Sequence, residues 1–88
     1  MKVDFLKKFY KDLDKITSDK LKNDLKKLIM DVEASNQISE IKNLKKLEGF
    51  KNAYRIKIGD YRIGVFIEED TIEFVRFVHR KDIYKKFP

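Results

Sequence analysis

Three cations flank one tight turn in the second half of the chain. Arg55 and Lys57 precede Gly59-Asp60, and Arg62 follows it. Glycine followed by aspartate suits a two-residue hairpin with glycine at its first central position. In that register Lys57 lies opposite Arg62, and Arg55 lies opposite Gly64. Like charges placed directly across a strand pair repel, so this pattern favours a patch that binds an anion such as phosphate.

The neighbours of these cations are suited to contact with nucleic acid. Gly64 falls in mid-strand, where glycine often marks the close approach of a ligand or another backbone. Strict alternation places Phe66, Val75 and Phe77 on the same face, where they could contact bases. Two alternatives stay open. Basic side chains on a sheet are often simply solvated, and the aromatic rings could be covered by the C-terminal Ile83, Tyr84 and Phe87.

Two other side chains could take part in chemistry. His79 ends the last predicted strand on the basic face, and histidine exchanges its proton near neutral pH; the alternative is a strand-end histidine without a role. Tyr84 could stack on a base or fill the C-terminal segment. The acidic run at residues 68–70 is predicted to be a solvated hairpin tip, because its carboxylates would repel a phosphate.

The first part of the chain is predicted to form a strand and a helical hairpin. Val3 and Phe5 alternate with polar residues, and apolar residues between Leu6 and Ile16 then follow helical spacing. Thr17-Ser18 can cap a second helix that ends around Ala34-Ser35-Asn36. Residues 36–53 suggest a loop with one helical turn, followed by an extended stretch that ends near Gly49.

From Tyr54 onward the hydrophobic period is two, which predicts strands at Tyr54–Ile58, Tyr61–Glu68 and Thr71–Val78. The fold class is therefore α+β: a short N-terminal strand, a two-helix hairpin, a three-stranded antiparallel meander and a short C-terminal helical turn. The face of the meander that packs on the helices is predicted to carry Tyr54, Ile56, Ile58, Tyr61, Ile63, Val65, Ile67, Ile72 and Phe74.

Composition narrows the function classes. The 88 residues predict a single domain, 1–88. The net charge of +6 favours an acidic partner. The chain has no cysteine and one histidine, which excludes disulfides and a zinc site of cysteine and histidine ligands; no cofactor or metal is expected. No apolar run is long enough for a membrane span, and the charged N-terminus does not resemble a signal peptide, so a cytoplasmic location is expected.

The second part of the chain resembles the RelE/ParE toxin superfamily, and in particular RelE-like mRNA interferases of type II toxin–antitoxin systems. The resemblance is carried by three segments, which fit the pattern KLxG…YRIRxGDYRI…HRxxIY: Lys46–Gly49, Tyr54–Ile63 and His79–Tyr84. It implies the fold described above. It also implies a metal-independent endoribonuclease that cuts mRNA in the ribosomal A site, where a ribose 2′-hydroxyl attacks the adjacent phosphate.

The resemblance assigns catalytic roles by motif. Arg55 and Lys57 occupy the two basic positions of the first meander strand, and Lys57 is the better candidate for proton transfer because a lysine can lose its proton more readily than an arginine. Arg62 and Arg80 match phosphate-binding positions. Tyr84 matches a tyrosine that orients the nucleotide or assists proton transfer.

Some features depart from the family pattern. Arg55 stands where the best-studied bacterial members have lysine, the interval from Arg80 to Tyr84 is shorter than in some members, and His79 is not general to the family. Strict alternation would also place Arg80 on the core face, so Arg80 must lie beyond the strand or after a bulge.

The resemblance further implies partners: a cognate acidic RelB-like antitoxin in a hetero-oligomer, the ribosome and mRNA, with no membrane. Two other functions remain open. ParE-type relatives share the fold but poison DNA gyrase, and they generally lack the full basic set. An inactive RNA- or antitoxin-binding module is the other alternative.

Overall fold

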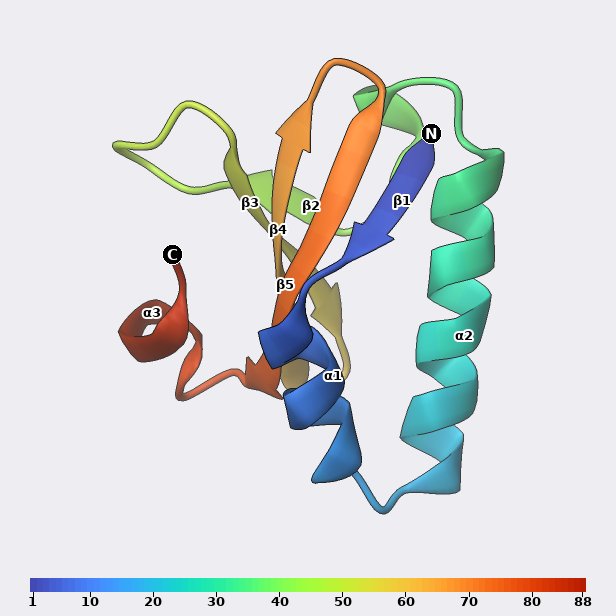
Figure 1. Ribbon diagram of the computed structural model, residues 1–88, viewed down its shortest axis with the longest axis vertical. Coiled ribbons are helices and arrows are strands. Elements are labelled where there is room, and N and C mark those ends of the chain that lie inside the picture. The colour runs from blue at the N-terminus through green and yellow to red at the C-terminus, as the bar shows by residue number, and fades with distance from the viewer.

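One five-stranded mixed sheet organises the molecule, as a computed structural model of residues 1–88 shows (Figure 1). The strands lie in the order β1-β5-β4-β3-β2. In chain order the elements are β1 (Lys2–Phe5), α1 (Lys7–Asp14), α2 (Asp19–Ala34), the 3-10 turn η1 (Ile38–Glu40), β2 (Leu44–Lys46), β3 (Ala53–Ile58), β4 (Tyr61–Glu68), β5 (Thr71–His79) and α3 (Ile83–Lys86).

The predicted meander forms the centre of this sheet, and the predicted α+β class is confirmed. Two short strands extend the meander beyond what the sequence predicted. β1 pairs in parallel with β5, and β2 pairs antiparallel with β3. The sequence predicted both as extended segments but not their partners, because pairing between distant segments leaves no local pattern. No helix is long and apolar enough to cross a membrane.

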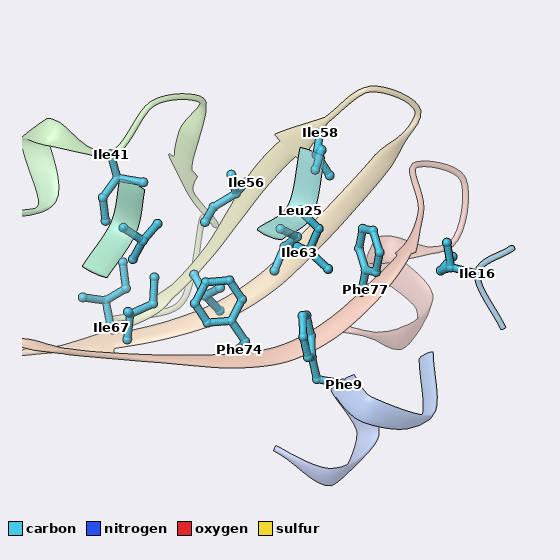
Figure 2. Packing of buried hydrophobic residues seen from close by; sticks show 13 residues of the cluster. Phe9, Ile16, Leu25, Ile41, Ile56, Ile58, Ile63, Ile67, Phe74 and Phe77 are labelled. Carbon is cyan, nitrogen blue, oxygen red and sulfur yellow. The ribbon is translucent and has the colours of Figure 1, made fainter. Parts of the chain in front are cut away.

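Helices α1 and α2 form the predicted hairpin and cover one face of the sheet. Ser18 caps α2 by accepting a hydrogen bond from the Leu21 backbone N–H at 3.2 Å, and the helix ends at Ala34 as predicted. Figure 1 shows α2 on one side of the sheet and α3 on the opposite side. The main core lies between the hairpin and the sheet, where Phe9, Leu25 and Phe74 meet the isoleucines of β3 and β4 (Figure 2).

The hairpin between β3 and β4 has the predicted register. Lys57 lies opposite Arg62, and Arg55 lies opposite Gly64. Gly59 adopts a φ of +58°, a backbone conformation that glycine reaches without steric cost. This turn therefore fixes which side chains of the two strands share the face away from the core. We call that face, opposite α1 and α2, the basic face.

A β-bulge in β5 changes the predicted orientation of the last residues of that strand. Gly64 pairs with Arg76 and Val65 pairs with Phe74, so Val75 is an extra residue. Beyond this point the alternation is reversed. The prediction that Phe77 and His79 lie on the basic face was wrong: Phe77 belongs to the main core, and His79 pairs with Tyr61.

The C-terminal segment covers the middle of the basic face. A second cluster there consists of Leu47, Ala53, Val78, Ile83 and Phe87, with Phe66 and Val75 packed against it. A Cβ at Gly64 would lie 2.5 Å from Cγ of Phe87. Gly64 therefore accommodates the protein's own Phe87 ring, and not the ligand or the backbone whose approach a mid-strand glycine often marks. Phe66 is covered by the same ring, with the two centroids 5.1 Å apart.

Candidate active site

Lys57 and Arg62 lie side by side on the basic face, next to the β3–β4 turn. Lys57 is exposed and Arg62 is half-buried. Arg62 Nη1 donates to the carbonyl oxygens of Gly59 and Tyr61, each at 2.9 Å. These two hydrogen bonds hold the guanidinium against the turn and leave its other N–H groups free for an anion. The pair thus presents an exposed ammonium beside a guanidinium that is held against the turn.

Arg80 joins the same end of the sheet. Its backbone N–H donates to the carbonyl of Asp60 at 2.8 Å, so the chain continues alongside the turn after β5 ends. Because of the bulge, Arg80 is in phase with Val78, which pairs with Arg62 on the basic face. The bulge therefore explains why Arg80 lies on the basic face, although strict alternation placed it on the core face.

Arg55 lies further from the turn and is enclosed by its neighbours. It is half-buried between Lys45 of β2 and Gly64 of β4. Its Nε is shielded from solvent and has no hydrogen-bond partner within the protein. Arg55 lines a groove of about 420 Å³ together with Tyr84, whose side chain is 69% exposed on α3. We call this the α3 groove; its other lining residues are Lys45, Lys46, Leu47, Glu48, Phe50, Phe87 and Pro88.

His79 lies apart from these cations. Its ring packs against Tyr61 in an edge-on arrangement with 5.6 Å between centroids, on the core side of the sheet. Its Nδ1 accepts a hydrogen bond from the Lys81 backbone N–H at 3.2 Å. The structure therefore brings together Arg55, Lys57, Arg62, Arg80 and Tyr84 around the basic face and leaves His79 on the opposite side.

Comparison with known proteins shows the family to which this chain belongs. Residues 3–84 match a family model described as the ParE toxin of the type II toxin–antitoxin system parDE. The chain is 43% identical to Toxin RelE3 of Methanocaldococcus jannaschii over the full length of both chains. The chain belongs to the RelE/ParE toxin superfamily.

Solved structures of RelE/ParE toxins have the same fold. A RelB-RelE antitoxin–toxin complex from Methanococcus jannaschii matches with a TM-score of 0.81 and 40% identity, covering 97% of this chain and 99% of the other. The intact E. coli RelBE complex matches with a TM-score of 0.68 and 23% identity over 89% of this chain and 94% of the other. At that identity the second match shows the fold alone.

Sequence analysis missed an ion pair between α1 and Arg76, the β5 residue that pairs with Gly64 on the basic face. Arg76 Nε donates to Asp12 Oδ2 at 2.8 Å and Arg76 Nη2 donates to Oδ1 at 3.0 Å, while the Phe77 backbone N–H donates to Oδ2 at 2.9 Å. β1 ends opposite Phe74, so the Asp12 carboxylate takes the place of a neighbouring strand for Phe77.

The same contacts perturb both ionisable groups. Burial alone would raise the pKa of Asp12, but the hydrogen bonds from Arg76 and Phe77 and the charges of Arg76 and Lys15 hold that pKa below its usual value of 3.8. The hydrogen bond to Asp12 likewise raises the pKa of Arg76. One signal in the sequence could have revealed Arg76: strict alternation places this charged residue on the core face, which is a sign of a bulge.

Proposed function

We propose that this RelE/ParE toxin is a ribosome-dependent endoribonuclease that cuts mRNA in the A site. The observation that supports the proposal is the group of cations on the basic face: Lys57 lies opposite Arg62 beside the β3–β4 turn, and Arg55 lies opposite Gly64 further along β3. In the proposed reaction the ribose 2′-hydroxyl attacks the adjacent phosphorus and the bond to the 5′-oxygen breaks. The products are a 2′,3′-cyclic phosphate and a 5′-hydroxyl.

Each residue of the set has a role that its chemistry supports. Arg62 and Arg80 bind the phosphate and stabilise the negative charge that develops on it. Lys57 transfers the proton, because it is the exposed member of the set whose ammonium can be deprotonated. Arg55 supports the neighbouring phosphate and Tyr84, exposed on α3, orients a base by stacking. His79 has no part in this proposal because it lies on the other side of the sheet.

We propose that the partner which restrains this toxin is an acidic antitoxin of the RelB kind. The net charge of +6 supports it, because a basic surface attracts an acidic chain. The structural relative from Methanococcus jannaschii is itself a complex of RelE with RelB. In this proposal the toxin is held inactive in a hetero-oligomer with the antitoxin, and the free toxin acts in the cytoplasm on mRNA at the ribosome.

The test is primer extension on mRNA in programmed ribosomes, comparing the native chain with the double variant Lys57→Ala, Arg62→Ala. We expect ribosome-dependent cuts from the native chain and a loss of about 10²-fold or more in the variant, because each residue acts on the developing charge or the proton. Circular dichroism and thermal unfolding establish that the variant is folded. Lys20→Ala, on the outer face of α2, is the matched control.

Absence of cuts from the folded native chain would overturn the nuclease proposal. A gyrase supercoiling assay on the same preparations then separates the two remaining functions. Inhibition of gyrase that survives the double substitution would indicate a ParE-like poison. Binding of RNA or antitoxin without cleavage or gyrase inhibition would indicate an inactive binding module.

A further inference from the structure

We propose that Arg76 is a positioning residue for the cleavage reaction: it joins Asp12 of α1 to the end of α3 and thereby fixes the position of Tyr84. This inference rests on the proposed function, in which Tyr84 orients a base. It adds Arg76 and Asp12, which have no role in that proposal and lie outside the segments that carry the family resemblance.

The side chain of Arg76 connects the two sides of the sheet. Arg76 pairs with Gly64, which the Phe87 ring covers on the basic face, whereas Asp12 belongs to α1 on the opposite side. β1 ends opposite Phe74, so no strand lies in the path of the guanidinium along the outer edge of β5. Of the hydrogen bonds formed by side chains, those of Arg76 alone join α1 to the segment after β5.

The three nitrogens of the Arg76 guanidinium are divided between the two helices. Nε and Nη2 donate to the Asp12 carboxylate at 2.8 and 3.0 Å, and this fork fixes the plane of the guanidinium. Nη1 is thereby directed towards Lys86, whose carbonyl oxygen accepts from it at 3.5 Å. Because this last bond is long, it depends on the orientation that the carboxylate imposes. A lysine has one nitrogen on a flexible stem, so it could keep the ion pair but not both contacts.

Helix α3 is short and depends on its neighbours for its orientation. It is a single turn in which Ile83 is the one buried residue. The carbonyl groups at the end of a helix have no partners within it, and Arg76 is the one side chain that donates to any of them. Phe87 packs directly after the helix, so the guanidinium and the ring together hold the peptide that follows Lys86. Tyr84 is 69% exposed, and its position therefore follows that of the helix.

The first test measures the motion of residue 84 in the absence of RNA. The chain has no tryptophan, so Tyr84→Trp supplies a single fluorophore on α3. We expect Arg76→Lys, made in that background, to raise the amplitude of the fast component of the fluorescence anisotropy decay. Asp12→Asn should do the same, because it removes the charge that orients the guanidinium. The control is Ile67→Val, which destabilises the main core without a contact to α3.

The second test is a double-mutant cycle of ribosome-dependent cleavage under single-turnover conditions. We expect Arg76→Lys to slow cleavage about 5- to 50-fold in the native chain, but by less than about twofold in the Tyr84→Ala variant, because its effect passes through Tyr84. A residue that merely stabilised the fold would slow both chains equally. Circular dichroism at the assay temperature establishes that each variant is folded, and Ile67→Val should cleave like the native chain.

Two results overturn the inference: an unchanged anisotropy decay in the folded Arg76→Lys and Asp12→Asn variants, or an equal loss of cleavage with and without Tyr84. The anisotropy measurement needs neither RNA nor ribosomes, so its outcome is separate from that of the proposed function. An unchanged decay together with cleavage by the native chain refutes only the inference. Absence of cleavage by the native chain refutes the nuclease, and with it any role of Arg76 in cleavage.

Discussion

Arg62 shows how backbone carbonyls of neighbouring residues can prepare a side chain for its proposed role. Its Nη1 is held by two carbonyl oxygens of the turn, so the guanidinium is oriented before substrate arrives. Such preorganisation is where much of the electrostatic contribution to catalysis originates. Lys57 lies directly opposite, and its ammonium, which we propose transfers the proton, has no such hydrogen bonds to the turn.

The contrast between Lys57 and His79 gives a prediction at this scale. We expect His79→Ala to keep ribosome-dependent cleavage within about threefold of the native chain, whereas Lys57→Ala loses about 10²-fold or more. The reason is position, since Lys57 and His79 lie on opposite faces of the sheet. Single-turnover cleavage rates measure both effects. Equal losses from the two substitutions, with both variants folded, would contradict the assignment.

At the scale of elements, α3 depends on contacts made by the residues that flank it. Phe87, which follows the helix, is 2% exposed and lies over Gly64 of β4, while Ile83 at its start is 1% exposed. These two side chains hold the short helix on the sheet, and Tyr84 projects from it into solvent. The position of Tyr84 therefore depends on the absence of a side chain at Gly64.

Gly64→Ala should consequently disturb α3 more than the strand. The added Cβ would meet the Phe87 ring at 2.5 Å, so the ring must move, and we expect a loss of about 1–3 kcal/mol in the free energy of unfolding. Phe87→Ala alone should cost about 3–5 kcal/mol because it empties a buried site. The double variant should cost less than the sum of the two, since the clash is then gone. Urea unfolding measures all three, and strict additivity would show that the ring and the glycine are not coupled.

The Asp12–Arg76 pair gives a second prediction for the elements, because it joins α1 to β5. The pKa of Asp12 is lowered in the fold, so its stabilisation is complete above the ordinary pKa of 3.8 and is lost as the pH falls through the lowered value. Asp12→Asn should cost about 3 kcal/mol at pH 7, because Arg76 loses its charged partner. The variant should also lose less stability than the native chain between pH 4 and more acidic conditions, in urea unfolding at a series of pH values. The exposed Asp14→Asn is the control and should follow the native curve.

At the scale of the whole molecule, the distribution of charge determines where RNA can bind and how strongly salt weakens that binding. The net charge of +6 is spread over the chain, yet on the basic face the cations gather near the β3–β4 turn and carboxylates lie towards the other end. RNA bound there should release counterions, so its affinity falls as salt rises. We expect Lys57→Ala to reduce the slope of log K against log salt concentration by about 0.7 for single-stranded RNA. Lys20→Ala, which removes a lysine paired with Asp24 on α2, should leave the slope unchanged.

The parts of the molecule that could be predicted from sequence are those fixed by local rules. The two-residue turn at Gly59-Asp60 set the register of β3 and β4, and Ser18 marked the start of α2. The pairing of β1 with β5 and the contact of Asp12 with Arg76 join segments about 60 or more positions apart, and no local pattern encodes them. The bulge was missed because strict alternation was assumed through Arg76.

The bulge shifts the register of β5 against β4 by one residue. Side chains of a strand alternate between its two faces, so the extra residue Val75 moves every later side chain to the opposite face. Arg80 therefore lies on the basic face and His79 on the core face, the reverse of what strict alternation predicted. A deletion of one residue at this point would undo the exchange while changing no motif. Among relatives, gain or loss of a single codon in this strand can therefore change which of two neighbouring side chains lies on the basic face. A comparison of the residue types at those two positions would not reveal the change.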